Sequence, residues 1–208
     1  MPITYPLDFP TSFGVSDFSF GVDHAVSGAE SEFSFEEQIQ EHPGVAWMIS
    51  FSLELLSRDQ AEEYNAFVLM LNGRKGTFLM SPPGSEQIRG QATGTVNVNG
   101  ANQVGHDLNV DGLAPSTTDV FKVGDYIQLG AGSQSTLHKV LQSSNSNASG
   151  QASLLIAPRM TSSPLDGSEV IYNSPKGLFR AAENFNPVSV RPPNQFSLSL
   201  NARQAVGG

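Results

Sequence analysis

The stretch WMISFSLELLSRDQAEEYNAFVLMLNGRKGTFLMSPP, residues 47–83, decides the fold because it contains the clearest strand and the clearest helix of the chain in succession. Its first ten residues alternate between apolar and polar, which predicts a strand with one buried face. The apolar positions are Trp47, Ile49, Phe51, Leu53 and Leu55. The run GTFLMSPP predicts a second strand that ends at Pro82-Pro83, since proline lacks the N–H that a sheet needs. These segments predict a β-α-β unit over residues 45–81.

Residues 57–72, between these strands, are predicted to form the one helix of the chain. Ser57 and Gln60 have the spacing of a capping box, and Gly73 provides a stop. The first turn carries Asp59 and Glu62, where the helix dipole favours negative charge. Apolar residues three or four positions apart form a stripe: Ala61, Tyr64, Phe67 or Val68, and Leu71. We expect this stripe to pack against a sheet.

Two Phe-rich runs precede this unit, DFSFGVDHAV at residues 17–26 and ESEFSFEEQIQE at residues 30–41. Both alternate, so they are predicted to form a hairpin. In that pairing Phe18, Phe20 and Val22 lie roughly opposite a second set of apolar residues, namely Phe33, Phe35 and Ile39.

From Gly90 to about residue 174 the sequence has no helical period and contains six short alternating runs. They are TGTVNVNG, HDLNVDG, DVFKVGDYIQLG, STLHKVLQS, ASLLIAPRM and SEVIYNS. Six short strands separated by turn residues predict a small barrel or sandwich, with SSNSNASG (143–150) as a hairpin tip. DVFKVGDYIQLG (119–130) is predicted to be a central barrel strand with a bulge at Gly124-Asp125. Near the C-terminus, NQFSLSLNA is expected to rejoin the first sheet through Phe196, Leu198 and Leu200, which makes the barrel an insertion.

The charge of the chain is negative and uneven. The formal net charge is −9, and residues 1–63 hold 12 Asp and Glu against the single Arg58, a balance of −11. A negative field repels phosphates, so sequence-specific nucleic-acid binding is not expected. No run approaches the roughly 20 apolar residues of a membrane span, and the N-terminus lacks the pattern of a secretory signal. We expect synthesis in a cytoplasm and no membrane insertion.

Residues with the pattern of a catalytic, cofactor-binding or metal site are not evident. DLNVDG (107–112) matches the opening of a calcium-binding EF-hand loop, but Thr118 stands where that loop needs a bidentate Glu and Pro115 interrupts it, so a hairpin turn is favoured. The four histidines have no metal-ligand spacing, and the chain has no cysteine. We therefore expect no enzyme activity, no cofactor and no metal, and a role in assembly.

The order of these segments resembles a family of viral proteins. A strand–helix–strand segment from Trp47, followed by a barrel carrying FKVGDYIQLG and LHKVL and ending in SPKGLFRAA, is similar to tail proteins of long-tailed bacteriophages. The similarity is greatest to the distal tail protein, which forms a ring at the tail tip. The barrel motif consists of Lys122, Val123, Gly124, Asp125 and Tyr126 with His138, Lys139 and Val140 downstream.

The resemblance implies a fold and a function. The fold would be mainly β with one helix: a tail-tube-like β-sandwich or split-barrel ring domain (residues 1–89 plus 178–208) and an inserted OB-like barrel (residues 90–177). Six copies would form a ring that joins the tail tube to the tail hub and fibres in the baseplate, used in host attachment. DNA would pass through its lumen. The protein would be made in the host bacterial cytoplasm and reside in the virion tail tip.

The acidic first third has a possible place in such a ring. If Glu36, Glu37 and Glu41 face the lumen, they would repel the DNA backbone and let it slide. Alternatives are a tail-tube or tail-completion ring protein, or a carbohydrate-binding adhesion module. The last would need exposed coplanar aromatic residues, whereas Trp47, the only tryptophan, lies on a strand face expected to be buried.

Overall fold

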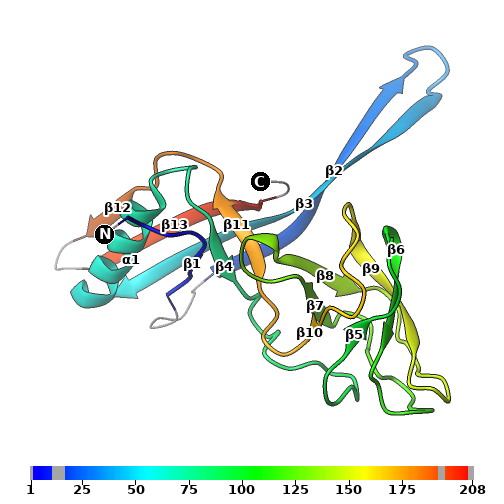
Figure 1. Ribbon diagram of the computed structural model, residues 1–208. Coiled ribbons are helices and arrows are strands. Elements are labelled where there is room, and N and C mark those ends of the chain that lie inside the picture. The colour runs from blue at the N-terminus through cyan, green and yellow to red at the C-terminus, as the bar shows by residue number, and fades with distance from the viewer. Residues whose placement is uncertain (1, 11–16, 192–194, 206–208) are drawn as a thin grey trace.

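The computed structural model describes residues 2–10, 17–191 and 195–205 (Figure 1). In this part of the chain the fold is mainly β with one α-helix, which confirms the predicted class. In chain order the elements are β1 (Leu7–Asp8), β2 (Asp17–Glu30), β3 (Glu37–Leu56), α1 (Arg58–Leu71), β4 (Phe78–Met80), β5 (Asn97–Val98), β6 (Gly105–Asp111), β7 (Tyr126–Leu129), a 3-10 turn (Gly132–Gln134), β8 (Thr136–Val140), β9 (Ala152–Met160), β10 (Val170–Ile171), β11 (Gly177–Ala181), β12 (Val188–Arg191) and β13 (Gln195–Gln204).

The first sheet has the order β1-β4-β11-β13-β3-β2, and β12 pairs with β13. β13 lies beside β3 with Leu198 and Leu200 buried, so the last strand rejoins the first sheet as predicted. The predicted strand, helix and strand occur in that order as β3, α1 and β4, but they do not form a β-α-β unit. Since each step from β3 through β13 and β11 to β4 is antiparallel, β4 runs opposite to β3 and two strands separate them. The two intervening strands come from the C-terminal part of the chain, which no local pattern could reveal.

Helix α1 follows the capping signals closely. The Ser57 hydroxyl accepts from the Gln60 N–H at 3.4 Å, and the Gln60 side-chain oxygen accepts from the Ser57 N–H at 3.0 Å. Asn72 adopts the left-handed conformation at the C-cap, one residue before the predicted Gly73. The buried stripe is Ala61, Tyr64, Phe67 and Leu71, so Phe67 and not Val68 occupies the alternative position.

The pairing predicted for the N-terminal hairpin is wrong. Phe18, Phe20 and Val22 lie opposite Phe51, Ile49 and Trp47, because β3 is one continuous strand from Glu37 to Leu56. The residues predicted as their partners, Phe33, Phe35 and Ile39, are exposed at the far end of the hairpin. The sequence did indicate a hairpin, but its second strand extends fifteen residues further than expected.

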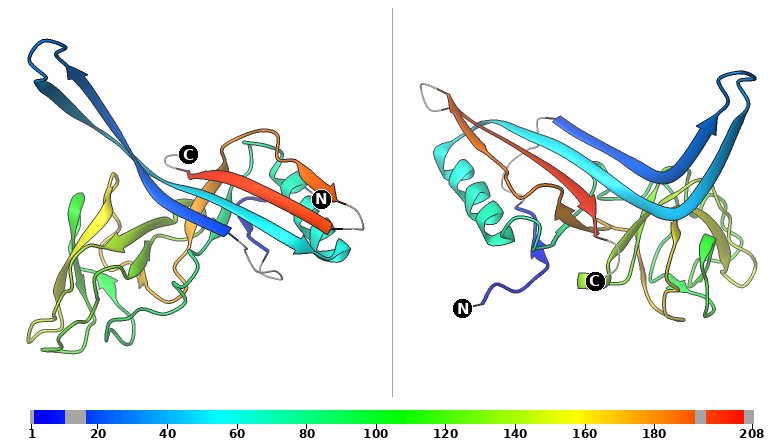
Figure 2. Two further views of the ribbon diagram at one scale, coloured as in Figure 1. Left: turned by 180° about the vertical axis from the view of Figure 1, so that it is seen from behind. Right: turned by 90° about the horizontal axis from the view of Figure 1, so that it is seen from above.

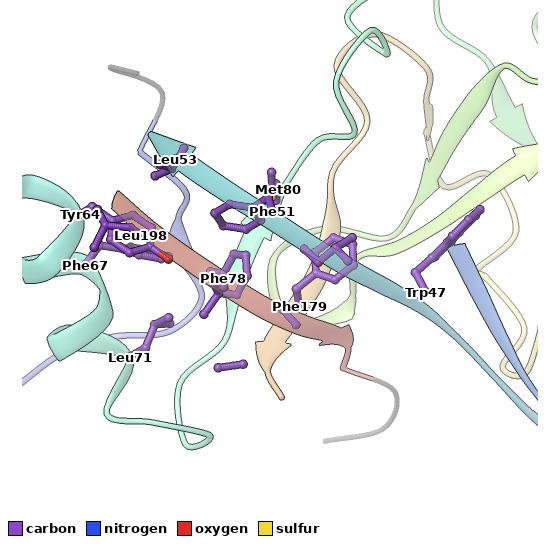
Figure 3. Packing of buried hydrophobic residues seen from close by; sticks show 14 of the residues in the cluster. Trp47, Phe51, Leu53, Tyr64, Phe67, Leu71, Phe78, Met80, Phe179 and Leu198 are labelled. Carbon is purple, nitrogen blue, oxygen red and sulfur yellow. The ribbon is translucent and has the colours of Figure 1, made fainter. Parts of the chain in front are cut away.

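One face of the first sheet and α1 enclose an aromatic core (Figure 3). Phe67 of α1 meets Phe78 of β4 edge to face, with ring centroids 5.6 Å apart. The alternating residues Ile49, Phe51 and Leu53 of β3 are all buried in this core, as predicted, while the side chain of Leu55 is outside what the structure describes. The register with β13 shifts between Phe196 and Leu198, which brings Leu56 into the core. Within residues 2–10, 17–191 and 195–205, no helix covers the opposite face of the sheet.

The second sheet has six strands in the order β10-β7-β8-β9-β6-β5 and is nearly closed into a barrel. Its two edges meet where Asn97 bridges Glu169 and the Val170 N–H donates to the Val96 carbonyl oxygen at 2.8 Å. SSNSNASG links β8 and β9, which pair antiparallel as a hairpin. DLNVDG is not the predicted hairpin turn: residues 107–111 belong to strand β6, with Leu108 and Val110 in the barrel core.

Trp47 joins the two sheets. Its ring stacks on Phe20 with centroids 4.2 Å apart, and its Nε1–H donates to the carbonyl oxygen of Leu137 in β8 at 2.7 Å. Leu137 is fully buried in the core of the first sheet, and Tyr126 of β7 packs against the same core. The barrel is therefore docked on the first sheet through apolar contacts and a buried indole hydrogen bond.

Asp125 anchors the first connection between the sheets. The chain leaves β4 at Met80 and enters β5 at Asn97, and the predicted boundary at 89/90 lies in this connection. The buried Asp125 carboxylate accepts from the N–H groups of Arg89, Gly90 and Lys122 at 2.9, 3.2 and 2.8 Å. A Cβ at Gly90 would lie 2.3 Å from the Val120 carbonyl oxygen, so only glycine fits. The predicted strand bulge at Gly124-Asp125 is instead a turn, because Asp125 closes the loop at Lys122 before β7 begins at Tyr126.

The return connection enters β11 at Gly177, at the predicted boundary of 177/178. The Lys176 N–H donates to the Gln128 side-chain oxygen at 2.7 Å, and the Ser135 hydroxyl donates to the Lys176 carbonyl oxygen at 2.6 Å. Both crossings between the two sheets are thus tied to the barrel by side-chain hydrogen bonds.

We expect Asp125→Ala to lower the free energy of unfolding by about 3 kcal/mol, since three backbone N–H groups lose a buried carboxylate acceptor. Chemical denaturation followed by tryptophan fluorescence measures this, because Trp47 lies at the junction. Asp107→Ala is the matched control, as Asp107 is exposed on β6. Equal effects of the two substitutions would contradict the anchoring role.

Candidate functional site

A long hairpin arm, residues 25–44, projects from the molecule (Figures 1 and 2). It is the continuation of β2 and β3 beyond the first sheet, and all of its residues except Ser31 are exposed. The exposed apolar side chains include Phe33 (98%), Phe35 (77%) and Ile39 (64%). A two-stranded ribbon with no buried face is marginal in water by itself. A partner that covers it would supply the missing contacts.

The arm begins at a bulge. The register passes from His24–Val45 to Val26–Glu41, so Ala25 lies opposite His42, Pro43 and Gly44. Bulges of this kind bend a ribbon and increase its twist. The bend is visible in Figure 2, where the arm turns away from the first sheet. The His42 ring nitrogen Nε2 lies 3.1 Å from the Ser27 hydroxyl, a cross-strand contact just beyond the bulge.

The tip of the arm is an ordered turn. The Ser31 N–H donates to the Glu36 carbonyl oxygen at 3.0 Å, and the Phe35 N–H donates to the Ser31 carbonyl oxygen at 2.9 Å. Phe35 has a positive φ of 55°, an uncommon conformation for an aromatic residue. The turn presents Phe33 and Phe35 to solvent in a defined position.

The arm carries a concentrated negative charge. Residues 25–44 contain five carboxylates and no Lys or Arg: Glu30, Glu32, Glu36, Glu37 and Glu41. Glu30 and Glu37 lie directly opposite each other, and like charges in that position destabilise a strand pair. Val26, Ile39 and Glu41 lie on the same face as this pair, because the register aligns Val26 with Glu41 and Gly28 with Ile39.

The predicted lumen-facing residues Glu36, Glu37 and Glu41 are all brought together on the arm. Glu36 lies in the tip turn, and the other two follow on β3. Whether they face a lumen depends on the assembly, so this role stays a prediction. Sequence reasoning missed the arm itself. The available signal was the acidic run from Glu30 to Glu41, which contains no Lys or Arg, together with Pro43-Gly44.

The barrel motif is a structural unit. Tyr126 and Lys139 are cross-strand neighbours, and the Lys139 Nζ donates to the Tyr126 hydroxyl at 3.1 Å. Lys122, Val123 and Gly124 form the turn before β7, where Gly124 has a φ of 92°. Arg89 donates from its guanidinium to the Val123 carbonyl oxygen and lies beside the Asp125 carboxylate. The motif holds the connection and the barrel together.

His138 is buried in this unit. Its Nδ1 lies 2.7 Å from the Pro158 carbonyl oxygen and its Nε2 lies 3.0 Å from the Thr136 hydroxyl, so the neutral ring donates to the first and accepts from the second. Burial lowers the pKa of His138 to about 4, although the bond to Pro158 opposes the shift. The ring stays neutral at physiological pH.

A cleft of about 480 Å³ lies where the barrel meets the first sheet. His138, Thr136 and Gln204 line it, and each already makes a hydrogen bond within the fold. In the described part of the chain, no three His, Asp or Glu side chains come close enough to hold a metal ion. Nor does that part include a helix long and apolar enough to cross a membrane.

A scan against protein-family models matches no family, and a search of curated proteins finds no matching sequence. Function is therefore inferred from the arm and from the surfaces of the two sheets.

We expect acidification to destabilise the chain partly through His138. The folded-state pKa of about 4 lies below the ordinary 6.5, so the unfolded state binds more protons between these values. The free energy of unfolding should fall by about 3 kcal/mol from this residue as the pH is lowered through that window. Subtracting the pH dependence of a His138→Gln variant removes the carboxylate contribution. Identical pH profiles would contradict the burial effect.

We expect the arm to be dispensable for folding of the single chain. Replacing residues 25–44 by Asn-Gly, which joins His24 to Val45 through a tight turn, should change the free energy of unfolding by less than about 1 kcal/mol, because no core residue is removed. Phe51→Ala, at a buried position, should cost about 3 kcal/mol or more in the same denaturation experiment. A collapse of stability in the arm-deleted chain would show that the arm belongs to the folding core.

Proposed function

We propose that the protein is a structural virion protein that forms a ring at the distal end of the tail of a long-tailed bacteriophage. The observation that carries this proposal is the projecting arm, which has both faces exposed and an acidic, partly apolar surface. Such an element has a physical reason to exist in an assembly and none in an isolated chain.

The free edge of the first sheet supports the same role. β2 is the edge strand over all of its fourteen residues, so one side of its backbone has no partner strand among the residues that the structure describes. Long exposed edges promote uncontrolled association unless they are covered. In a closed ring of identical copies, each copy makes the same contact with its neighbour, so no copy is left with that contact surface exposed.

The role proposed is structural and not enzymatic. The buried polar residues Asp125, Gln128 and His138 all serve contacts between backbone segments. In the proposed ring the first sheet and the arm form the inner part, the barrel decorates the outside, and the copy number is six. The ring would connect the tail tube to the tail hub and fibres, allow DNA to pass, and reside in the virion after synthesis in the host bacterial cytoplasm.

A carbohydrate-binding adhesion module is disfavoured by one observation. Flat exposed aromatic rings usually provide the platform for sugars, but Trp47, the only tryptophan, is 4% exposed and stacks inside the junction, so the exposed rings are phenylalanines such as Phe33 and Phe35. A tail-tube or tail-completion ring would use the same kind of subunit, and it differs in whether rings stack without limit.

The purified chain should form closed rings of about six copies, and the arm-deleted chain should remain monomeric at the same concentration. Light scattering behind a sizing column gives the mass, and negative-stain images of the same peak give the shape. Long tubes would favour the tail-tube alternative. A monomeric wild-type chain, tested up to millimolar concentration and with tail-tube subunits added, would refute the ring.

A further inference from the structure

One part of the exposed face of the first sheet, on β11 and β13, carries two positive charges. Arg180 of β11 and Arg203 of β13 lie directly opposite each other, and both side chains are exposed. Two like charges in this position destabilise a strand pair. Among the described residues neither guanidinium has an ion-pair partner. The molecule thus holds two like-charged cross-strand pairs of opposite sign, Glu30–Glu37 and Arg180–Arg203.

The arginine pair belongs to a row of residues that crosses the first sheet. In the same row across the sheet, Arg203 lies beside Met48, and Met48 lies beside Gly21. The next row contains Ser50 and Ser19. These residues define the outer face, which is opposite the face covered by α1. Beside the exposed Met48, this part of the face carries Gly21, two serines and Asn201, whose side chains are short enough for a ribbon to lie over them.

We infer that the arm of one copy docks on the outer face of the next copy, with Glu30 and Glu37 against Arg180 and Arg203. This inference rests on the proposed ring and names its subunit contact. The occupant is a second copy of this chain because the arm projects beyond its own sheet and does not fold back onto it (Figure 2).

The spacing of the charged and apolar side chains is similar on the arm and on the outer face. On the arm, Glu37 and Ile39 share a face and lie about 7 Å apart, at ~3.3 Å per residue. On the outer face, Arg203 and Met48 are neighbours on adjacent strands, which are about 5 Å apart. A crossing ribbon can therefore place a carboxylate beside the arginine pair while Ile39 covers Met48. Both charged pairs lose their repulsion, and the apolar side chains leave water.

The contact is heterologous, since the arm and the outer face are different surfaces of the same chain. A repeated heterologous contact closes into a ring when its rotation permits and otherwise extends as a filament. This assignment gives Glu37 a subunit contact in place of the lumen-facing role expected from the sequence. The two roles differ in outcome: reversing a lumen-facing charge leaves assembly intact, whereas reversing a contact charge abolishes it.

Charge reversal tests the pairing directly. Glu30→Lys/Glu37→Lys should abolish assembly, and Arg180→Glu/Arg203→Glu should do the same, as measured by light scattering. An equimolar mixture of the two variants should assemble again, because each arm then meets an outer face of opposite charge. Matched controls with the same change in net charge are Glu62→Lys/Glu183→Lys and Arg74→Glu/Lys75→Glu, at exposed positions away from both surfaces. Both controls should assemble as the wild type does.

Cysteine pairing tests the geometry independently of ring closure. The chain has no cysteine, so an Ile39→Cys variant mixed with a Met48→Cys variant under mild oxidation should form a disulfide-linked heterodimer. Ile39→Cys mixed with Leu69→Cys, an exposed position on α1, should not.

The outcomes separate this inference from the proposed function. Rings that survive both reversals, or that are lost without rescue in the mixture, overturn the inference and leave the ring standing. Open filaments with the Ile39–Met48 cross-link support the contact and overturn the ring. No assembly and no cross-link overturn both.

Discussion

The pairing of β2 with β3 is the constraint on which the rest of the structure depends. Phe18, Phe20 and Val22 must face the core, and a shift of one residue in the register would turn them to solvent. The same two strands continue into the arm, so the core determines which arm residues share a face. At the bulge β3 gains two residues relative to β2, and an even number preserves the alternation. Val26 therefore lies on the face that continues the core, and Glu30 and Glu37 lie with it.

Trp47 lies where β3 passes from the first sheet into the arm. On one side of it β3 has one buried face, and on the other side both faces of β3 are exposed. Its indole hydrogen bond to Leu137 and its stacking on Phe20 fix the barrel relative to the root of the arm. Tyr126 lies 6.1 Å from the Trp47 ring, and Lys139 caps Tyr126. These contacts restrain the barrel relative to the part of β3 from which the arm continues.

Two surfaces of this chain carry charges that the chain itself does not neutralise, whereas its two cores are well packed. Both cores are closed by aromatic and aliphatic packing, and the buried carboxylate and imidazole have hydrogen-bond partners. The arm and the outer face, by contrast, each keep a like-charged pair that the single chain does not neutralise. Well-packed cores combined with two uncompensated charged pairs of opposite sign on the surface are typical of a subunit. In the proposed ring, one contact between copies would neutralise both pairs.

The sequence by itself determined the features that depend on neighbouring residues. The helix, its capping box and its buried stripe follow from Ser57 to Leu71, and the six barrel strands follow from short alternating runs. The return of the last strand to the first sheet also followed from its apolar alternation. Pairing between distant segments was decided by the tertiary structure. Phe18 and Phe20 alternate equally well against Phe33 and Phe35 or against Phe51 and Ile49, and only packing against the core of the first sheet favours the second arrangement. The sequence likewise predicted a bulge at Asp125. Its actual role was hidden because the N–H groups of Arg89 and Gly90 that it binds lie 36 and 35 residues away in the chain. The charged pairs Glu30–Glu37 and Arg180–Arg203 exist only once strands are in register, so no inspection of the sequence could have found them.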